Sequence, residues 1–303
     1  MDKFNIVILN WNGWEDTRQC IESILVNSTK LNYNIILVDN GSKLDEIELI
    51  NTYCLEKFKY NIINDKEFFL EQNQVLPEIF SVCPSNEKII FIKNNENLGF
   101  ANGNNIALKF LKNIGEKYAL LLNNDTEIED GALNKMFDYL TNDVTNTIGA
   151  VIPQIRFFHP KDVIWNCGGS INALGIRRYF YAFKNIKNVP QSGASRVDYG
   201  TGCALLMDSS KTDILSSKFF FGEEDLELAF RLKSNGFKIM CLYDAVVYHK
   251  VGASRAKISE QRMGNMVFHY SQRMSNLRDH LPYILWLVSF AGHYLSTINL
   301  LRK

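Results

Sequence analysis

Short apolar segments that end in polar turn residues recur along the first half of this chain. Phe4–Leu9 is followed by Asn-Trp-Asn-Gly, Asn34–Val38 by Asp-Asn-Gly-Ser, and Tyr118–Leu122 by Asn-Asn-Asp-Thr. Helical patterns lie between these segments, and strands that alternate with helices predict βαβ units and a mostly parallel sheet. Ligands bind at the carboxyl ends of the strands in open sheets of this kind, so the polar residues after each strand are candidates for a binding site.

The same patterns predict the other elements of an α/β fold. A strand is predicted at Lys88–Ile92, and apolar residues at helical spacing predict helices at Asp16–Val26 and about Ala101–Leu111. In the second half, three strands and then one helix are predicted at Gly149–Arg156, Asp198–Met207, Lys238–Tyr248 and Glu223–Asn235. We therefore expect a mostly parallel central sheet that is flanked by helices.

Two segments depart from this regular alternation. Residues 44–87 combine helical pieces with a polar stretch, and a connection of this length predicts an insertion that lies outside the chemistry. Residues 276–303 are predicted to form a basic and apolar helical tail. The main domain is accordingly expected over residues 1–275.

Composition excludes several classes of protein. Hydrophobic residues make up 46% of the 303 residues and charged residues 22%, which is typical of a globular chain and not of a disordered or fibrous one. Basic and acidic residues balance at 33 each, so we expect no nucleic-acid partner. The six cysteines form no Cys-x-x-Cys pair and several lie in apolar runs, which indicates buried thiols in a reducing compartment. No secretory signal pattern opens the chain, so we expect a cytoplasmic location.

The end of the chain combines positive charge with an apolar segment. Residues 250–303 hold eight Lys and Arg but two Asp and Glu, and Leu281–Leu301 contains no charged residue at all. Several polar residues interrupt this segment, so it is a poor candidate for a membrane span. We favour a helix that lies on an anionic membrane surface; docking on a partner or on the protein body, and a true span, are the alternatives.

Three acidic or imidazole positions are candidates for chemistry. Asp125 stands in the turn after a buried strand, where it serves either a metal or a local turn. The triplet Glu223, Glu224 and Asp225 opens a helix whose dipole favours negative charge, and the adjacent phenylalanines favour a raised pKa and a general base. His249 ends a predicted strand. It is a candidate metal ligand only together with Asp125, since an imidazole and a carboxylate oxygen suit Mn²⁺.

A glycine- and asparagine-rich loop, Asn94–Asn105, opens the helix predicted near residue 101. Gly99 and Gly103 permit a close approach of the backbone, and the N–H groups at a helix start can face a phosphate. The loop is neither Gly-x-Gly-x-x-Gly nor a P-loop, so it does not predict a dinucleotide site of those kinds.

Taken in order, these motifs resemble the family 2 glycosyltransferases, the inverting group with the GT-A (nucleotide-diphospho-sugar transferase) fold, and most closely their bacterial rhamnosyltransferase-like members. The resemblance covers about residues 4–275. The matching segments are VILNWNG (7–13), VDNGS (38–42), NENLGFANGNN (95–105), LLNNDT (121–126), GTGCALLM (200–207), EEDLELAFRLKSNG (223–236) and HKVGAS (249–254). It implies transfer of a sugar, with inversion, from a nucleoside diphosphate to an acceptor hydroxyl.

The resemblance also implies roles for individual residues. Asp125 matches the last Asp of the family's metal motif, whose first acidic position is Asn123 here, and His249 matches a histidine that joins the metal. Asp225 matches the proposed general base. Donor-binding positions are implied at Asn10, Asn12, Asp39, Asn97, Gly99, Asn123 and Asn124.

One further segment resembles the family only in part. The run HYSQRMSN (269–276) is similar to the family's Tyr…Arg-Asn segment, but Met274 replaces the Asn. We therefore assign no role to this segment from the sequence.

The implied cofactor is Mg²⁺ or Mn²⁺, and the implied donor is linked to UDP, dTDP or GDP. The acceptor is expected to be a glycan or a lipid-linked glycan of cell-surface polysaccharide synthesis, with the enzyme peripheral on the cytoplasmic face of the membrane and free to form a homodimer. Two alternatives stay open at this point. One is a non-catalytic glycan- or nucleotide-sugar-binding protein on the same scaffold. The other is a nucleotidyltransferase, although NWNGWED (10–16) lacks the basic residue that such an enzyme needs after the first strand.

Overall fold

A large mixed sheet forms the centre of the computed structural model, which describes residues 3–28, 31–65, 88–220, 222–251 and 262–301. The strands are β1 (Phe4–Asn10), β2 (Tyr33–Asp39), β3 (Tyr60–Asp65), β4 (Lys88–Lys93), β5 (Tyr118–Asn123), β6 (Thr126–Ile128), β7 (Ile148–Phe157), β8 (Ile164–Asn166), β9 (Gly169–Ile171), β10 (Arg177–Tyr179), β11 (Ala194–Val197), β12 (Ala204–Asp208) and β13 (Lys238–His249). The helices are α1 (Trp14–Asn27), α2 (Leu44–Lys57), α5 (Gly99–Asn113), α6 (Ala132–Thr141), α7 (Ser209–Thr212), α8 (Glu224–Ser234), α9 (Arg262–His280) and α10 (Tyr283–Leu301), with a 3-10 turn at Ile186–Asn188.

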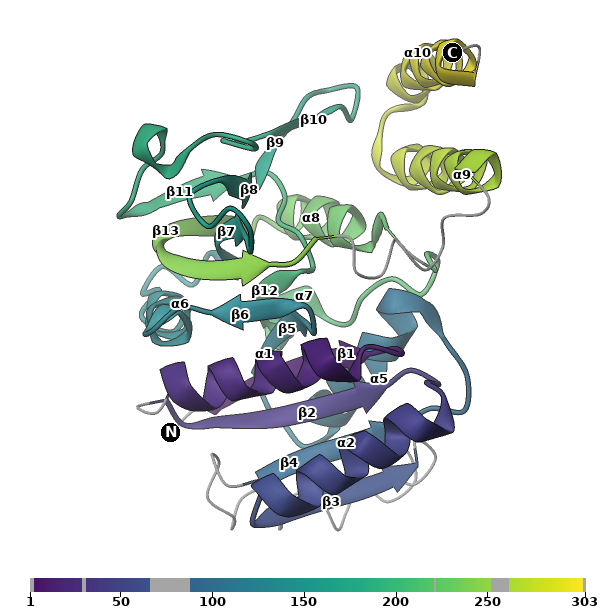
Figure 1. The fold of residues 1–303 in the computed structure, drawn as a ribbon. Coiled ribbons are helices and arrows are strands. Elements are labelled where there is room, and N and C mark those ends of the chain that lie inside the picture. The colour runs from purple at the N-terminus through teal and green to yellow at the C-terminus, as the bar shows by residue number, and fades with distance from the viewer. Residues whose placement is uncertain (1–2, 29–30, 66–87, 221, 252–261, 302–303) are drawn as a thin grey trace.

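Eleven of the described strands form one sheet in the order β11-β13-β7-β12-β5-β1-β2-β4-β3, with β6 beside β13 and β8 beside β7 (Figure 1). Strands β1–β5, β7 and β13 run in one direction, and β6, β8, β11 and β12 run against them. The expected α/β fold with a mostly parallel central sheet and flanking helices is therefore confirmed. Strands β9 and β10 form a separate antiparallel ribbon.

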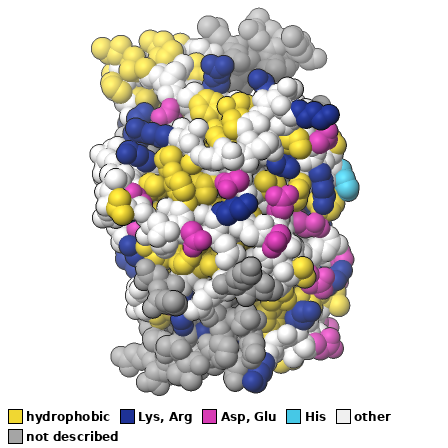
Figure 2. Space-filling model, turned by 90° about the vertical axis from the view of Figure 1, so that its left-hand side faces the viewer, with side chains coloured by type: hydrophobic (Ala, Val, Ile, Leu, Met, Phe, Trp, Pro, Cys, Tyr) yellow, Lys and Arg dark blue, Asp and Glu magenta, His cyan; other side chains and the backbone are white. Residues whose placement is uncertain are grey.

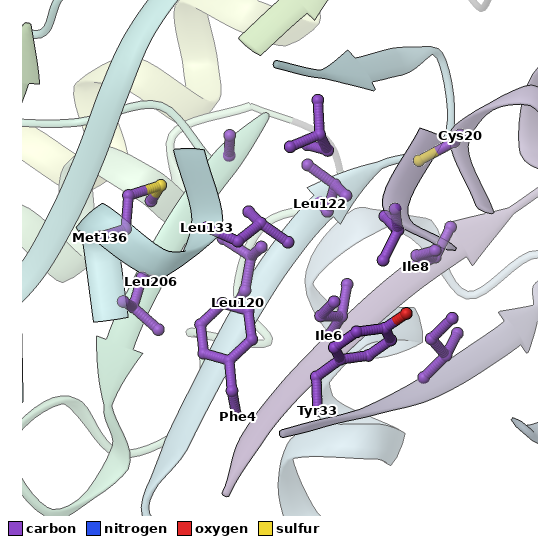
Figure 3. Packing of buried hydrophobic residues seen from close by; sticks show 14 of the residues in the cluster. Phe4, Ile6, Ile8, Cys20, Tyr33, Leu120, Leu122, Leu133, Met136 and Leu206 are labelled. Atoms are coloured by element: carbon purple, nitrogen blue, oxygen red, sulfur yellow. The ribbon is translucent and has the colours of Figure 1, made fainter. Parts of the chain in front are cut away.

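The central strands are buried on both faces. On β1, Ile6 and Ile8 pack on one side of the sheet with residues from α1, α2 and α6, while Val7 packs on the other side with residues from α5 and α8. Figure 3 shows the first of these clusters, in which Leu120 and Leu122 of β5 lie close to β1. Such burial leaves polar side chains only at the ends of these strands, so the strands themselves place the candidate binding residues at one edge.

The structure differs from the sequence predictions in two places. Of the strand predicted at Asp198–Met207, only the second part forms β12, and Tyr199 instead makes an isolated antiparallel bridge to Gly169. The segment expected as an insertion over 44–87 begins with α2 and β3, and β3 pairs with β4 as the edge strand of the main sheet. These two elements therefore continue the βαβ alternation, and residues 66–87 lie outside the described residues.

The end of the chain is helical, and the boundary expected between residues 275 and 276 falls inside α9. Helices α9 and α10 contact each other and stand at one end of the molecule (Figure 1). No helix in the described part of the chain is long and apolar enough to cross a membrane. On the face drawn in Figure 2, basic and acidic side chains are interspersed.

Five cysteines lie in the described ranges. All five are buried and free, as expected from their apolar surroundings, and Cys83 lies outside the described residues. Burial raises the pKa of Cys20 to about 12, so this thiol stays protonated at neutral pH.

The two-sided burial makes a direct prediction about stability. Leu120 is fully buried in β5, so Leu120→Ala should lower the free energy of unfolding by about 2–5 kcal/mol through lost packing and the cavity that remains. Leu55→Ala, at a 61% exposed position of α2, is the matched control and should change it by less than about 0.5 kcal/mol. Urea denaturation measures both, and equal effects would contradict the packing described here.

Candidate functional site

The carboxyl ends of four parallel strands meet at one edge of the sheet. Asn10 of β1 lies beside Asp39 of β2, Asp39 beside Lys93 of β4, and Leu9 beside Asn123 of β5. This register brings together polar residues that are more than a hundred positions apart in the chain. The expected donor-binding residues of β1, β2 and β5 accordingly share this edge.

Asp39 is the buried anchor of this edge. Its carboxylate accepts hydrogen bonds from Asn10 Nδ2 (2.8 Å), the Ser42 amide (2.9 Å) and Ser42 Oγ (2.5 Å). The side chain is not exposed to solvent at all. In this structure Asp39 therefore holds the loops after β1 and β2 together.

Amide side chains extend this network to the neighbouring loops. Asn124 Nδ2 donates to Thr17 Oγ1 (3.0 Å) and to the Gly13 carbonyl (3.3 Å), which ties the loop after β5 to the start of α1. Asn12 accepts from the Lys43 amide through Oδ1 (2.9 Å), and its own amide donates to Ser42 Oγ (2.8 Å). These hydrogen bonds thus connect the loops that carry the residues expected to bind the donor.

The loop before α5 closes this edge on another side. Asn97 Oδ1 accepts from Asn40 Nδ2 and from the Gly99 amide, both at 2.9 Å. Gly99 has a left-handed backbone (φ 78°), and a Cβ there would lie 2.3 Å from the carbonyl oxygen of Phe220. Only glycine permits this contact, which places the Asn97 loop against the segment that leads into α8.

Asp125 and His249 are in direct contact. Strand β6 pairs with the end of β13, where Thr126 lies opposite His249, and this pairing brings His249 Nε2 to 3.0 Å from Asp125 Oδ1. Both side chains are buried, and the Trp165 ring lies edge-on to the imidazole at 4.5 Å. The two residues that were expected at a metal therefore lie side by side.

The spacing of this pair fits two ligands of one cation. Adjacent ligands of an octahedral Mg²⁺ lie about 2.1 Å from the ion and hence about 3.0 Å from each other. Among the described residues, no group of three or more His, Cys, Asp or Glu side chains is arranged to hold a metal. A cation at Asp125 and His249 would therefore take its other ligands from water or phosphate oxygens.

The acidic triplet at the start of α8 occupies three different environments. Glu223 has a left-handed backbone (φ 88°) and precedes the helix, whereas Glu224 and Asp225 lie in its first turn. Glu223 is buried, and both of its carboxylate oxygens accept hydrogen bonds. Arg273 Nη1 lies 3.0 Å from Oε2, and Asn276 Nδ2 lies 3.1 Å from the same oxygen. Arg177 Nη2 lies 3.2 Å from Oε1. Its charge is fully compensated, so Glu223 is a structural anchor.

Glu224 and Asp225 are the two acids of the triplet whose pKa values are raised. Burial, followed by the nearby Asp225, raises the pKa of Glu224 to about 8, and Glu224 Oε2 has no hydrogen-bond partner. Burial also raises the pKa of the half-buried Asp225, while the Arg177 guanidinium acts in the opposite direction. A carboxylate with a raised pKa that still reaches solvent can accept a proton from a hydroxyl group.

The loop of Gly202 and Cys203 lies close to both candidate acids, Asp225 and Asp125. The amide of Gly202 interacts with the Asp225 carboxylate, and the next residue, Cys203, accepts a hydrogen bond from the Asn123 amide (2.8 Å). Asn123 stands two residues before Asp125. The loop before β12 therefore lies between the Asp225 carboxylate and the loop that carries Asp125.

Arg177, Arg273 and Asn276 are site residues that sequence reasoning missed. Arg273 and Asn276 lie one helical turn apart on α9 and both bind Glu223, and Arg273 also donates to the Gly175 carbonyl. Met274, which replaces the family's Asn, is buried. The partial resemblance of residues 269–276 was the available signal in the sequence.

Known proteins resemble this chain in part of its sequence and in its fold. Residues 5–68 match the protein-family model described as Glycosyl transferase family 2. No curated protein matches the chain.

Three solved structures share the fold at low sequence identity. GalNAc-T7 with UDP, GalNAc and Mn²⁺ has a TM-score of 0.55 at 14% identity, over 82% of this chain and 43% of that one. Residues 1–349 of S. aureus TarS have a TM-score of 0.53 at 12% identity, over 98% and 72%. The mannosyltransferase PcManGT from Pyrobaculum calidifontis with GDP-Man and Mn²⁺ has a TM-score of 0.53 at 11% identity, over 96% and 69%. The chain thus spans less than half of GalNAc-T7, and the fold is that of GT-A glycosyltransferases.

The ion pairs of Glu223 predict the effect of removing one of its cationic partners. Arg273→Met leaves a buried carboxylate with one fewer cation, so it should lower the free energy of unfolding by about 2–4 kcal/mol. Arg278→Met changes an exposed arginine of the same helix and should have an effect below about 0.5 kcal/mol. Denaturant unfolding of both variants is the measurement, and equal stabilities would contradict the anchoring role.

The raised pKa of Glu224 predicts a pH dependence of stability. The folded state keeps the proton up to about pH 8 while the unfolded state loses it near 4.5, so this group's contribution to stability falls as pH rises through that window. The free energy of unfolding of the wild type relative to Glu224→Gln should therefore decrease between pH 5 and pH 8.5, by an amount on the order of a few kcal/mol. Glu96→Gln, at an exposed position, should show no such trend. A pH-independent difference for Glu224→Gln would refute the shift.

Proposed function

We propose that this protein is an inverting glycosyltransferase that moves a sugar from a nucleoside diphosphate to a hydroxyl group of a glycan or lipid-linked acceptor. The observation that carries the proposal is that Gly202 interacts with the Asp225 carboxylate while the next residue, Cys203, bonds to Asn123, two residues before the Asp125 that contacts His249. The partial family match and the fold shared with nucleotide-sugar enzymes support the same reaction class.

Donor binding is assigned to the polar edge of the sheet. Asn12, Asn123 and Asn124 line this edge with the Asn97–Gly99 loop, and the fully buried Asn10 and Asp39 keep its loops in position from within. UDP, dTDP and GDP sugars are the candidate donors, since the similar structures contain UDP or GDP-Man. Mg²⁺ or Mn²⁺ held by Asp125 and His249 would neutralise the charge that develops on the diphosphate leaving group.

Asp225 is assigned the proton transfer. Its raised pKa makes it basic enough to take the proton of the acceptor hydroxyl while the oxygen attacks the anomeric carbon from the side opposite the diphosphate. Attack from that side inverts the configuration of the carbon. The proton remains on the Asp225 carboxyl until it is released to water. Transfer should therefore slow as pH falls through the raised pKa of Asp225.

The role of Asp225 is tested by a change that removes its basicity. Asp225→Asn should lower the transfer rate by about 10²–10⁴-fold and leave donor binding intact, because the general base acts only on the acceptor. Asp213→Asn, at an exposed ion pair with Lys112, is the control that should transfer normally. Release of nucleoside diphosphate measures transfer. Near-normal turnover by Asp225→Asn would show that the base is another group.

The role of Asp125 is tested by donor binding. A thermal-shift panel of UDP, GDP, dTDP and CDP sugars with Mn²⁺ should identify one donor that raises the melting temperature, because a ligand of the native state stabilises it. Asp125→Ala should abolish the Mn²⁺-dependent part of this shift. An unchanged shift would contradict the metal assignment. Donor binding by the wild type without transfer or hydrolysis would favour the non-catalytic alternative.

A further inference from the structure

Helix α10 presents a row of large apolar side chains to solvent. The exposed large side chains along it are Tyr283, Ile284, Leu287, Val288, Phe290 and Tyr294. They follow the helical repeat and form one continuous stripe, which we call the α10 stripe. In contrast, Ser289 is buried and His293 is half-buried on the opposite side. A surface helix of a water-soluble protein normally has the reverse arrangement.

Defined contacts hold α10 in this orientation. Trp286 Nε1 donates to the Met274 carbonyl of α9 (3.0 Å), and Tyr270 of α9 donates through its hydroxyl to the Phe290 carbonyl (3.3 Å). The inner side of the helix is thereby fixed on α9, and the α10 stripe is the side that stays available. An exposed apolar surface of this size on one element indicates a binding surface.

Charge decides which partner fits this stripe. Leu281–Leu301 carries no charged residue, while Arg278 precedes it and Arg302 and Lys303 follow it in the sequence. Two basic residues of the region are already paired, Lys250 with Asp16 and Arg273 with Glu223, yet the excess of positive charge over residues 250–303 remains. Two copies joined through this region would bring like charges together, whereas an anionic lipid surface attracts them.

We propose that the α10 stripe docks on the surface of an anionic lipid bilayer, with α10 lying in the plane of the interface. Aliphatic side chains enter the boundary of the acyl chains, and the tyrosines lie at the level of the headgroups, where amphipathic rings are favoured. The cations at both ends of α10 contact the anionic headgroups.

This docking places the candidate site near the bilayer. Helix α9 lies between α10 and α8, and its Arg273 and Asn276 bind Glu223 at the start of α8, two residues from Asp225 (Figure 1). If the proposed glycosyl transfer holds, a lipid-linked acceptor would approach Asp225 from the membrane side. The docking itself does not depend on that reaction.

Vesicle sedimentation of the full chain tests the docking without measuring sugar transfer. The wild type should bind vesicles of phosphatidylcholine with phosphatidylglycerol more tightly than vesicles of phosphatidylcholine alone, and added salt should weaken the binding. The double variant Ile284→Glu/Val288→Glu should lose at least about tenfold in affinity, because two charges enter the apolar stripe. Val144→Glu, at a 98% exposed position of the main domain, is the matched control and should bind as the wild type does.

The milder variant Leu287→Gln keeps the test decisive if the double variant fails to fold, which circular dichroism would reveal; it should also bind more weakly. Three results would overturn the proposal: a wild type that does not bind the anionic vesicles, a folded stripe variant that binds them as the wild type does, or a wild-type dimer that these substitutions dissociate while no vesicle binding occurs. Donor-induced thermal shifts of the same samples report separately on the proposed function.

Discussion

Burial of the central strands on both faces is the constraint on which the candidate site depends. Strands such as β1 and β5 direct apolar side chains to both clusters, so polar chemistry is confined to their ends. The buried Asp39 carboxylate then joins two of these ends through Asn10 and Ser42. Losing this anchor would leave buried amide groups without partners, which is costly in a dry environment. The packing of the sheet and the buried Asp39 carboxylate therefore fix the positions of the polar residues at this edge.

The second half of the chain brings the groups that we propose as reactive to this edge. Strand β13 brings His249 to Asp125, and α8 brings Asp225 to the Gly202 loop. Helix α9 secures the start of α8 through the ion pair of Arg273 with Glu223. The tail is thus part of the support of the candidate site, and its outer helix offers the surface that we assign to lipid. The start of α8 and the α10 stripe are thus linked through α9.

Much of the fold follows from sequence patterns, because the central strands are continuous apolar runs with clear turn residues. The patterns failed where a distant partner decides, as where Tyr199 bridges to Gly169, and where a short strand is flanked by polar residues, as in β3. The contact of Asp125 with His249 rested on the family resemblance, since 123 residues separate them in the sequence and no local pattern predicts it. The Glu223 anchor escaped prediction because it depends on how α9 packs against α8.

We infer that this edge binds a nucleoside diphosphate together with a divalent cation at Asp125 and His249. The most direct measurement is anomalous X-ray diffraction from crystals of the protein grown with Mn²⁺ and a nucleoside diphosphate. Our account predicts a manganese peak within bonding distance of Asp125 Oδ1 and His249 Nε2, with diphosphate oxygens completing the coordination. A peak at other residues, or a bound nucleotide with no manganese beside this pair, would contradict it.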